Sequence, residues 1–222
     1  MRLDSLSELL LACPYPSQME HIDCGILGAG YYPGAQGFSG RSPEGGVMLL
    51  GRDFGTKSYY DRLSGTPAKD ETAPTWQRTK EHYFPSFQGV PIWCTNYLLG
   101  VRKSGSAMGN VKKHIDPREW EPYERHCWNF LQSQVLLQRP RLVLVLGVPN
   151  RQDLTTASRF GKNFSEEVRH TFRDDEGQHT AVVALLDHPH SLIPRARQAV
   201  VLTRLQAMRR VYERESSNRL TG

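Results

Sequence analysis

Hydrophobic residues along the chain form four short runs that are rich in valine, isoleucine and leucine. The runs cover Val47–Leu50, Ile92–Thr95, Leu142–Leu146 and Thr180–Leu186. Short apolar runs of this kind are typical of strands buried on both faces, and separations of about 35 to 50 residues leave room for crossover helices. The pattern predicts a three-layer α/β sandwich in which a central, mostly parallel four-stranded sheet is flanked by helices.

Other segments have the period of an amphipathic helix. Between Trp120 and Gln138, and again from Val201 to Val211, apolar side chains recur every three or four residues. Residues 1–16 form a shorter segment of the same kind, with acidic residues between the apolar ones. Gly25–Gly46 and Lys103–Lys113 are rich in glycine or in glycine, serine and lysine, so we expect loops there.

Length and composition favour one domain over residues 1–222. The apolar runs are far shorter than the roughly 20 residues that cross a bilayer, and the N-terminus lacks the basic start of a secretory signal. Four cysteines in a chain of this size do not look like a disulfide scaffold. We therefore expect a monomer in the cytoplasm, without a membrane contact.

The net charge of +5 is compatible with a nucleic-acid partner, although many basic proteins have none. The distribution of the charge is more informative. Arginines concentrate in the C-terminal quarter, at Arg195, Arg197, Arg204, Arg209 and Arg210. This placement, close to the end of the last predicted strand, favours a polyanionic partner.

Three of the four predicted strands are followed by a residue that carries chemistry: Asp53, Asn96 and His188. Ligands of parallel α/β sheets bind beyond the carboxyl ends of the strands, so these side chains converge if the sheet is right. In cleavage of an N-glycosidic bond, Asp53 would orient water, Asn96 would read a base edge, and His188 would stabilise the departing pyrimidine. Each residue alone also fits a turn or a helix cap.

The motifs around these residues resemble the uracil-DNA glycosylase superfamily from about Gly46 to Arg197. Residues 51–55, GRDFG, resemble the family motif GQDPY; residues 87–96, FQGVPIWCTN, resemble its strand that ends in asparagine. Residues 188–192, HPHSL, are similar to HPSPL. The resemblance implies that Asp53 activates water, that Asn96 reads the base, and that His188 is the catalytic histidine.

The same resemblance implies a DNA-binding surface around the last motif. Leu192 stands where the family has an apolar wedge that fills the gap left by a flipped nucleotide, although a leucine here could equally anchor the loop. Ser191, Arg195 and Arg197 are the expected neighbours on DNA, together with Arg102 from the asparagine motif.

Residues 124–147 resemble the iron–sulfur branch of the family, in which a cysteine at the position of Cys127 is a cluster ligand. Gly100 stands where another ligand is expected, and Cys13 and Cys24 lack C-x-x-C spacing. Because such a cluster needs four converging thiolates, we expect no cluster, no metal and no other cofactor, with Cys127 in the core.

Departures from the family motif concern the base. Gly55 replaces the tyrosine that excludes C5 substituents, and Arg52 replaces a glutamine and adds a donor. The candidates for stacking are Phe54, which we prefer, Tyr59 and Tyr60, although each of them also fits ordinary packing. The expected activity is that of a monofunctional DNA N-glycosylase, a hydrolase that removes uracil or, in preference, a C5-modified pyrimidine and leaves an abasic site. DNA repair and defence against viruses with modified DNA are both compatible settings.

The main alternative is a non-catalytic reader of modified or single-stranded nucleic acid on the same fold. Asp53 argues against it, because a carboxylate beside phosphates repels DNA. A nucleotide hydrolase would need a phosphate-binding G-x-x-x-x-G-K-[ST] motif or paired acidic ligands, and the sequence has neither.

Overall fold

The computed structural model describes residues 3–21, 44–53, 55–58, 61, 77–105, 111–147, 160, 167–175, 177–187 and 195–218. The helices are α1 (Leu3–Leu11), a π-helical turn (Thr79–Tyr83) leading into α5 (Phe84–Ser86), a 3₁₀ turn (Val111–His114), α6 (Pro117–Gln138) and α8 (Arg195–Asn218). The strands are β1 (Met19–Glu20), β2 (Val47–Gly51), β3 (Ile92–Asn96), β4 (Val101–Arg102), β5 (Leu142–Gly147), β6 (Val168–Asp174) and β7 (Gly177–Asp187).

The main sheet has the order β3-β2-β5-β7-β6. β3, β2, β5 and β7 are parallel and coincide with the four apolar runs, so these strands and the α/β class are confirmed. The expectation of a four-stranded sheet is wrong, because β6 adds a fifth strand antiparallel to β7. β6 is an edge strand with mostly polar residues, and its sequence VRHTFRD therefore lacks the apolar run of an internal strand.

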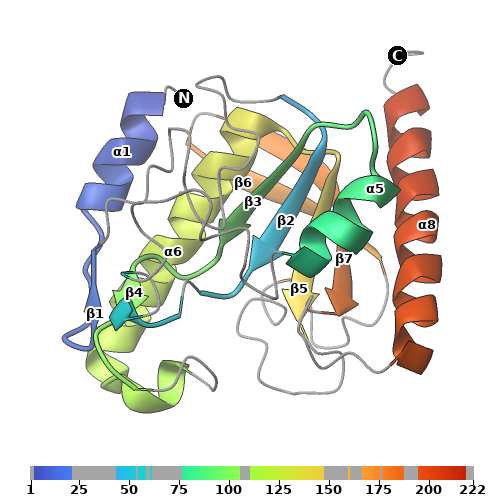
Figure 1. The fold of residues 1–222 in the computed structure, drawn as a ribbon. Coiled ribbons are helices and arrows are strands. Elements are labelled where there is room, and N and C mark those ends of the chain that lie inside the picture. The colour runs from blue at the N-terminus through green and yellow to red at the C-terminus, as the bar shows by residue number, and fades with distance from the viewer. Residues whose placement is uncertain are drawn as a thin grey trace.

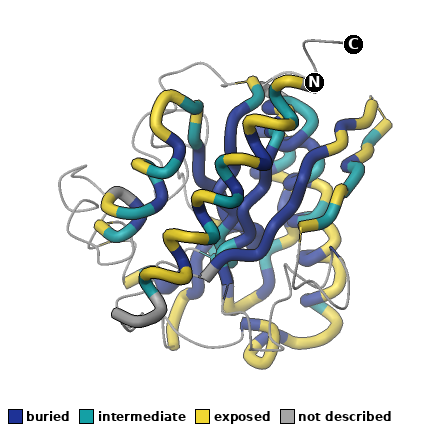
Figure 2. Tube along the Cα trace, turned by 90° about the vertical axis from the view of Figure 1, so that its right-hand side faces the viewer, coloured by how far each residue is buried: buried dark blue, intermediate teal, exposed yellow. Residues whose placement is uncertain are grey.

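The sheet separates two apolar cores. Alternate residues of each parallel strand point to opposite faces, as the pleat requires. Met48 and Leu50 of β2 contribute to a core shared with α1 and α6. Val47 and Leu49 contribute to a second core that includes residues of α5 and α8. Helices thus cover both faces (Figure 1), and the apolar runs of the four parallel strands between them are largely buried (Figure 2).

Local signals explain where α6 begins and ends. The Asp116 side chain caps the helix by accepting from the Arg118 N–H at 2.8 Å, and Pro117 occupies the first turn. Arg139 ends the helix in the left-handed region, with φ of +47°. The periodic segment in the sequence therefore coincides with α6. None of the described helices is long and apolar enough to cross a membrane.

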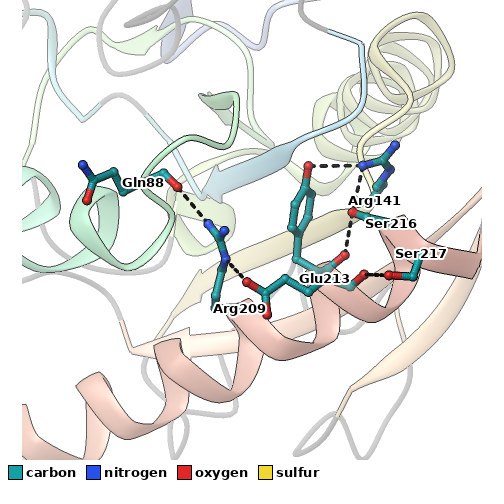
Figure 3. Close-up of polar contacts among 7 residues, drawn as sticks. Gln88, Arg141, Arg209, Glu213, Ser216 and Ser217 are labelled. Atoms are coloured by element: carbon teal, nitrogen blue, oxygen red, sulfur yellow. Dashed lines mark hydrogen bonds and ion pairs between the residues drawn. The ribbon is translucent and has the colours of Figure 1, made fainter.

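The C-terminal helix α8 is attached to the sheet by polar contacts as well as by its apolar face (Figure 3). Arg141, just before β5, donates to the Ser216 hydroxyl at 2.8 Å and to the Tyr212 hydroxyl at 3.3 Å. Arg209 donates to the Gln88 carbonyl oxygen at 3.0 Å. Because Arg141 and Gln88 precede strands, these contacts lie at the amino edge of the sheet.

A second, two-stranded sheet lies outside the main one. β1 pairs with β4 in antiparallel register, which places Met19 opposite Arg102. Thr56, in the segment after β2, forms a parallel bridge with Arg102. The sequence did not predict this sheet, because strands of two residues show no periodicity. It positions Arg102 beside the segment that follows β2.

Candidate active site

The candidate site begins where β2 and β3 end side by side. Gly51 and Asn96 are register partners at the carboxyl ends of these parallel strands, and the arrowheads of β2, β5 and β7 point to the same side in Figure 1. The segments that follow the two strands also stay paired. The N–H of Tyr97 donates to Gly51 O, and the N–H of Leu98 donates to Arg52 O, both at 2.9 Å. The segments that carry Asp53 and Asn96 are therefore neighbours.

Asn96 is only 3% exposed. Its Nδ2 finds no acceptor among the described residues, and its Oδ1 lies against the backbone of Gly51, where an ideal Cβ would be only 2.3 Å away. A glycine at position 51 is thus required for this position of Asn96. A buried amide N–H without a partner is costly, and the described residues supply no acceptor for this one.

Both carboxylate oxygens of Asp53 have donors. Oδ1 accepts from the Gly55 N–H at 2.8 Å and from Nη2 of Arg102 at 3.3 Å. Oδ2 accepts from Nε of Arg52 at 2.6 Å. The side chain of Asp53 is only 5% exposed, so two guanidinium groups compensate a nearly buried negative charge.

The two arginines differ in their access to solvent. The side chain of Arg52 is 32% exposed, whereas that of Arg102 is 7% exposed. The sequence predicted that Arg102 contacts DNA and that Arg52 contacts the base. The buried position of Arg102 does not fit a phosphate contact, and its guanidinium faces Asp53 instead. Arg52 also bonds Asp53, and its partial exposure leaves it accessible to a ligand.

Gly55 has a structural requirement of its own. Its φ is +87°, a backbone conformation that side chains with a Cβ rarely adopt. The sequence attributed this glycine to space for a C5 substituent, but the backbone alone accounts for it. Phe54, the stacking candidate, lies outside the described residues.

Helix α6 fixes the segment that follows Asn96. The Tyr97 hydroxyl donates to the buried carboxylate of Glu124. The N–H of Leu99 donates to the Cys127 sulfur at 3.5 Å, and the carbonyl oxygen of Leu99 accepts from the Tyr123 hydroxyl at 2.5 Å. Burial raises the pKa of Tyr123, so its hydroxyl stays a donor at neutral pH.

Cys127 is fully buried in the core, as the sequence predicted. A hydrogen bond with its thiol, together with burial, raises the pKa of Cys13. At Gly100 a Cβ would lie 2.5 Å from the ring of Tyr15 and 2.4 Å from a backbone oxygen, so a cysteine does not fit there. In the described part of the chain, no group of three or more His, Cys, Asp or Glu residues is arranged to hold a metal ion.

The remaining predicted site residues lie beyond the end of β7. His188, Ser191 and Leu192 are outside the described residues, and only the backbone of Arg195 and Arg197 is described, at the start of α8. β7 ends at Asp187, which pairs with Gly147. Strand β7, which His188 follows in the sequence, therefore ends at the same edge of the sheet as Gly51 and Asn96.

The sequence did not reveal the structural roles of three residues that support the site. Gly51 was taken as part of a motif and not as the neighbour of Asn96. Glu124 stands beside the apolar stripe of α6, and a charged residue at such a position is a signal for a buried polar contact. Arg102 as a partner of Asp53 left no signal, because the pairing joins positions that are far apart in the sequence.

Comparison with known proteins adds no relative. No model of a known protein family matches this chain, and no curated protein matches it either.

Proposed function

We propose that this protein is a DNA glycosylase that flips a pyrimidine out of DNA and hydrolyses its N-glycosidic bond, leaving an abasic site. The observation that carries the proposal is the position of Asp53 and Asn96 at the adjacent carboxyl ends of β2 and β3, with the Asn96 amide buried and without an acceptor among the described residues. A carboxylate for water and a donor for a base edge then face one reacting nucleoside.

The charges support this chemistry. The transition state of N-glycosidic cleavage carries positive charge on the sugar and negative charge on the base. Asp53 stabilises the sugar and accepts a proton from water, while Asn96 Nδ2 donates to a carbonyl oxygen of the base. The hydrogen bond from the Gly55 N–H keeps the Asp53 carboxylate in place.

Further roles are proposed from the sequence alone, for residues whose side chains the structure does not describe. In this proposal His188 follows β7 and donates to the pyrimidine O2 as charge accumulates there. Leu192 fills the gap left by the flipped nucleotide, and Ser191, Arg195 and Arg197 bind the neighbouring backbone.

The proposed base is uracil or, in preference, a pyrimidine with a C5 substituent. Gly55 places no ring in the path of such a group, and the partly exposed Arg52 offers a donor to a polar substituent. Phe54 is the proposed stacking residue. Because φ of Gly55 is +87°, replacing Gly55 by tyrosine would strain the backbone as well as fill space, so substrates and not this substitution should be varied.

The test is to incubate the protein with oligonucleotides that contain uracil, a 5-hydroxymethylpyrimidine or a pyrimidine with a larger C5 group, and then to cleave abasic sites with alkali. We expect cleavage at one or more of these bases, and a rate about 100- to 10,000-fold lower for Asp53→Asn, which loses the general base. Intact strands across the whole panel would contradict the proposal.

The two biological settings need a cellular test. Cells that carry either the active protein or Asp53→Ala are infected with viruses whose DNA is modified or plain. Lower plating of only the modified virus on the active strain is the result expected for antiviral defence. Equal plating would instead leave repair as the proposed setting.

One observation favours the second candidate, a non-catalytic reader of modified or single-stranded nucleic acid. Arg52 and Arg102 compensate the charge of Asp53, so the carboxylate does not repel DNA as a free one would. The oligonucleotide panel separates the two candidates, because a reader binds a modified strand and leaves no abasic site.

A further inference from the structure

The two oxygens of the Asp53 carboxylate are unequal. A carboxylate oxygen accepts about two hydrogen bonds. Oδ1 already has two donors, the Gly55 N–H at 2.8 Å and Arg102 Nη2 at 3.3 Å. Oδ2 has one donor among the described residues, Arg52 Nε at 2.6 Å. Oδ2 is therefore the oxygen with an acceptor position left for water.

Arg102 is itself held rigidly. Its backbone N–H donates to Gly55 O at 3.0 Å, it bridges to Thr56, and it pairs with Met19 of β1. Its side chain is 7% exposed. Arg52, in contrast, directly precedes Asp53 and is 32% exposed, so it is the more easily displaced of the two partners.

We propose that Arg102 is a positioning residue that fixes Oδ1 of Asp53 and thereby assigns Oδ2 to the reaction. This inference rests on the proposed function. The water oxygen bonds to C1′ of the sugar while the C1′–N bond breaks and its electron pair leaves with the base. The water proton passes to Oδ2, and Arg102 keeps that oxygen directed at the water through its bond to Oδ1.

The first test separates rate from affinity. Arg102→Met and Arg102→Lys are compared with the wild type in single-turnover cleavage at saturating protein, and binding of the same oligonucleotide is measured by fluorescence anisotropy. We expect the rate to fall by about 10- to 100-fold, since small misplacements of a reacting group are costly. The dissociation constant should stay within about twofold of the wild-type value.

Arg125→Met is the matched control, because Arg125 is an exposed arginine whose partner is Glu121 on the same helix. It should leave both the rate and the affinity unchanged. An Arg102 variant that binds DNA about tenfold more weakly, with an unchanged rate at saturation and a smaller salt dependence, would overturn the inference in favour of a DNA contact.

The second test is independent of activity. Thermal unfolding of Asp53→Asn, Arg102→Met and the double variant forms a double-mutant cycle. If Arg102 holds the charge of Asp53, the double variant loses less Tm than the sum of the single losses, because neither partner is left buried alone. Additive losses would overturn the inference. If the wild type forms no abasic sites, the proposed function fails, while the cycle still decides whether the two side chains are coupled.

Discussion

The two edges of the parallel sheet both use arginine, but in different surroundings. At the carboxyl edge, Arg102 and Asp53 form an ion pair whose side chains are 7% and 5% exposed. At the amino edge, Arg209 and Glu213 form an ion pair whose side chains are 30% and 56% exposed (Figure 3). Both contacts are arginine–carboxylate ion pairs, but the side chains of the pair at the amino edge are several-fold more exposed to water.

This difference decides what each pair contributes. An exposed pair contributes about 0–1 kcal/mol, because water screens it. A buried pair gains little over an apolar contact, yet removing one partner costs about 3–5 kcal/mol, since the other charge stays buried. At the carboxyl edge, the buried pair therefore fixes the position of its side chains, but the loss of either partner strongly destabilises the protein. At the amino edge, the loss of any one contact of α8 costs little stability. We expect substitutions at the first edge to lower both activity and stability, and those at the second to lower stability alone.

After Asp53→Asn, a large effect at the carboxyl edge is expected from Gly51→Ala. A Cβ at this position would lie 2.3 Å from Oδ1 of Asn96, so the short carboxamide has to move. A displacement of about 1 Å can lower a rate by about 100-fold, and we expect a loss of about 10- to 100-fold in abasic-site formation. Single-turnover cleavage measures it.

Gly177→Ala is the control for Gly51→Ala. Gly177 begins β7, and a Cβ there would meet nothing within 4 Å. The single-turnover cleavage rate of Gly177→Ala should equal that of the wild type. Equal rates for both variants would show that the position of Asn96 is unimportant for the reaction.

The sequence predicted the strands of the sheet that are buried on both faces. β2 and β5 read as continuous apolar runs because each lies between two cores. β6 was not predicted, because an edge strand faces water and needs no continuous apolar run. Apolar patterning reports burial, and it detects strands only where burial is complete.

Part of the candidate site followed from the same logic. Asn96 ends β3 and Asp53 follows β2 by two residues, so the neighbouring positions of the two segments could be predicted from the sheet. Arg102 was assigned to DNA from its place in the motif that contains Asn96. Its burial depends on the β1–β4 pairing and on the charge of Asp53, and both are tertiary contacts that no local pattern records.

A smaller effect, on stability and not on activity, is expected from Arg141→Met at the amino edge. The substitution removes hydrogen bonds to Ser216 and Tyr212 and a guanidinium that lies 5.7 Å from the centre of the Tyr212 ring. Such contacts together contribute about 1–3 kcal/mol. Urea unfolding should show this loss, with the cleavage rate unchanged. If Arg141→Met lowers the cleavage rate and leaves the free energy of unfolding unchanged, the proposed difference between the two edges is wrong.

Arg209→Met tests the exposed pair directly. It removes the contact with Glu213 at 2.7 Å and the bond to Gln88 O at 3.0 Å. Because Arg209 is 30% exposed, we expect a loss of about 0–1 kcal/mol in urea unfolding, clearly less than for Arg141→Met. A loss as large as that of Arg141→Met would mean that exposure does not govern the strength of these contacts.

The smallest effect concerns His170 on the edge strand β6, where a titratable ring packs against aromatic side chains. The ring contacts Phe160, Phe172 and Trp128, and burial lowers the pKa of His170 below its ordinary value. The unfolded chain then binds the proton more readily, so the stability from this group is present above about pH 6.5 and is lost as the pH falls through the folded pKa.

In His170→Phe, the decrease in Tm between pH 7 and pH 5 should be smaller than in the wild type by about 1–2 °C, since the ring is only partly buried. His114→Phe, at an exposed histidine, serves as the control. An equal decrease in the wild type and His170→Phe would mean that the apolar cluster tolerates the charged ring.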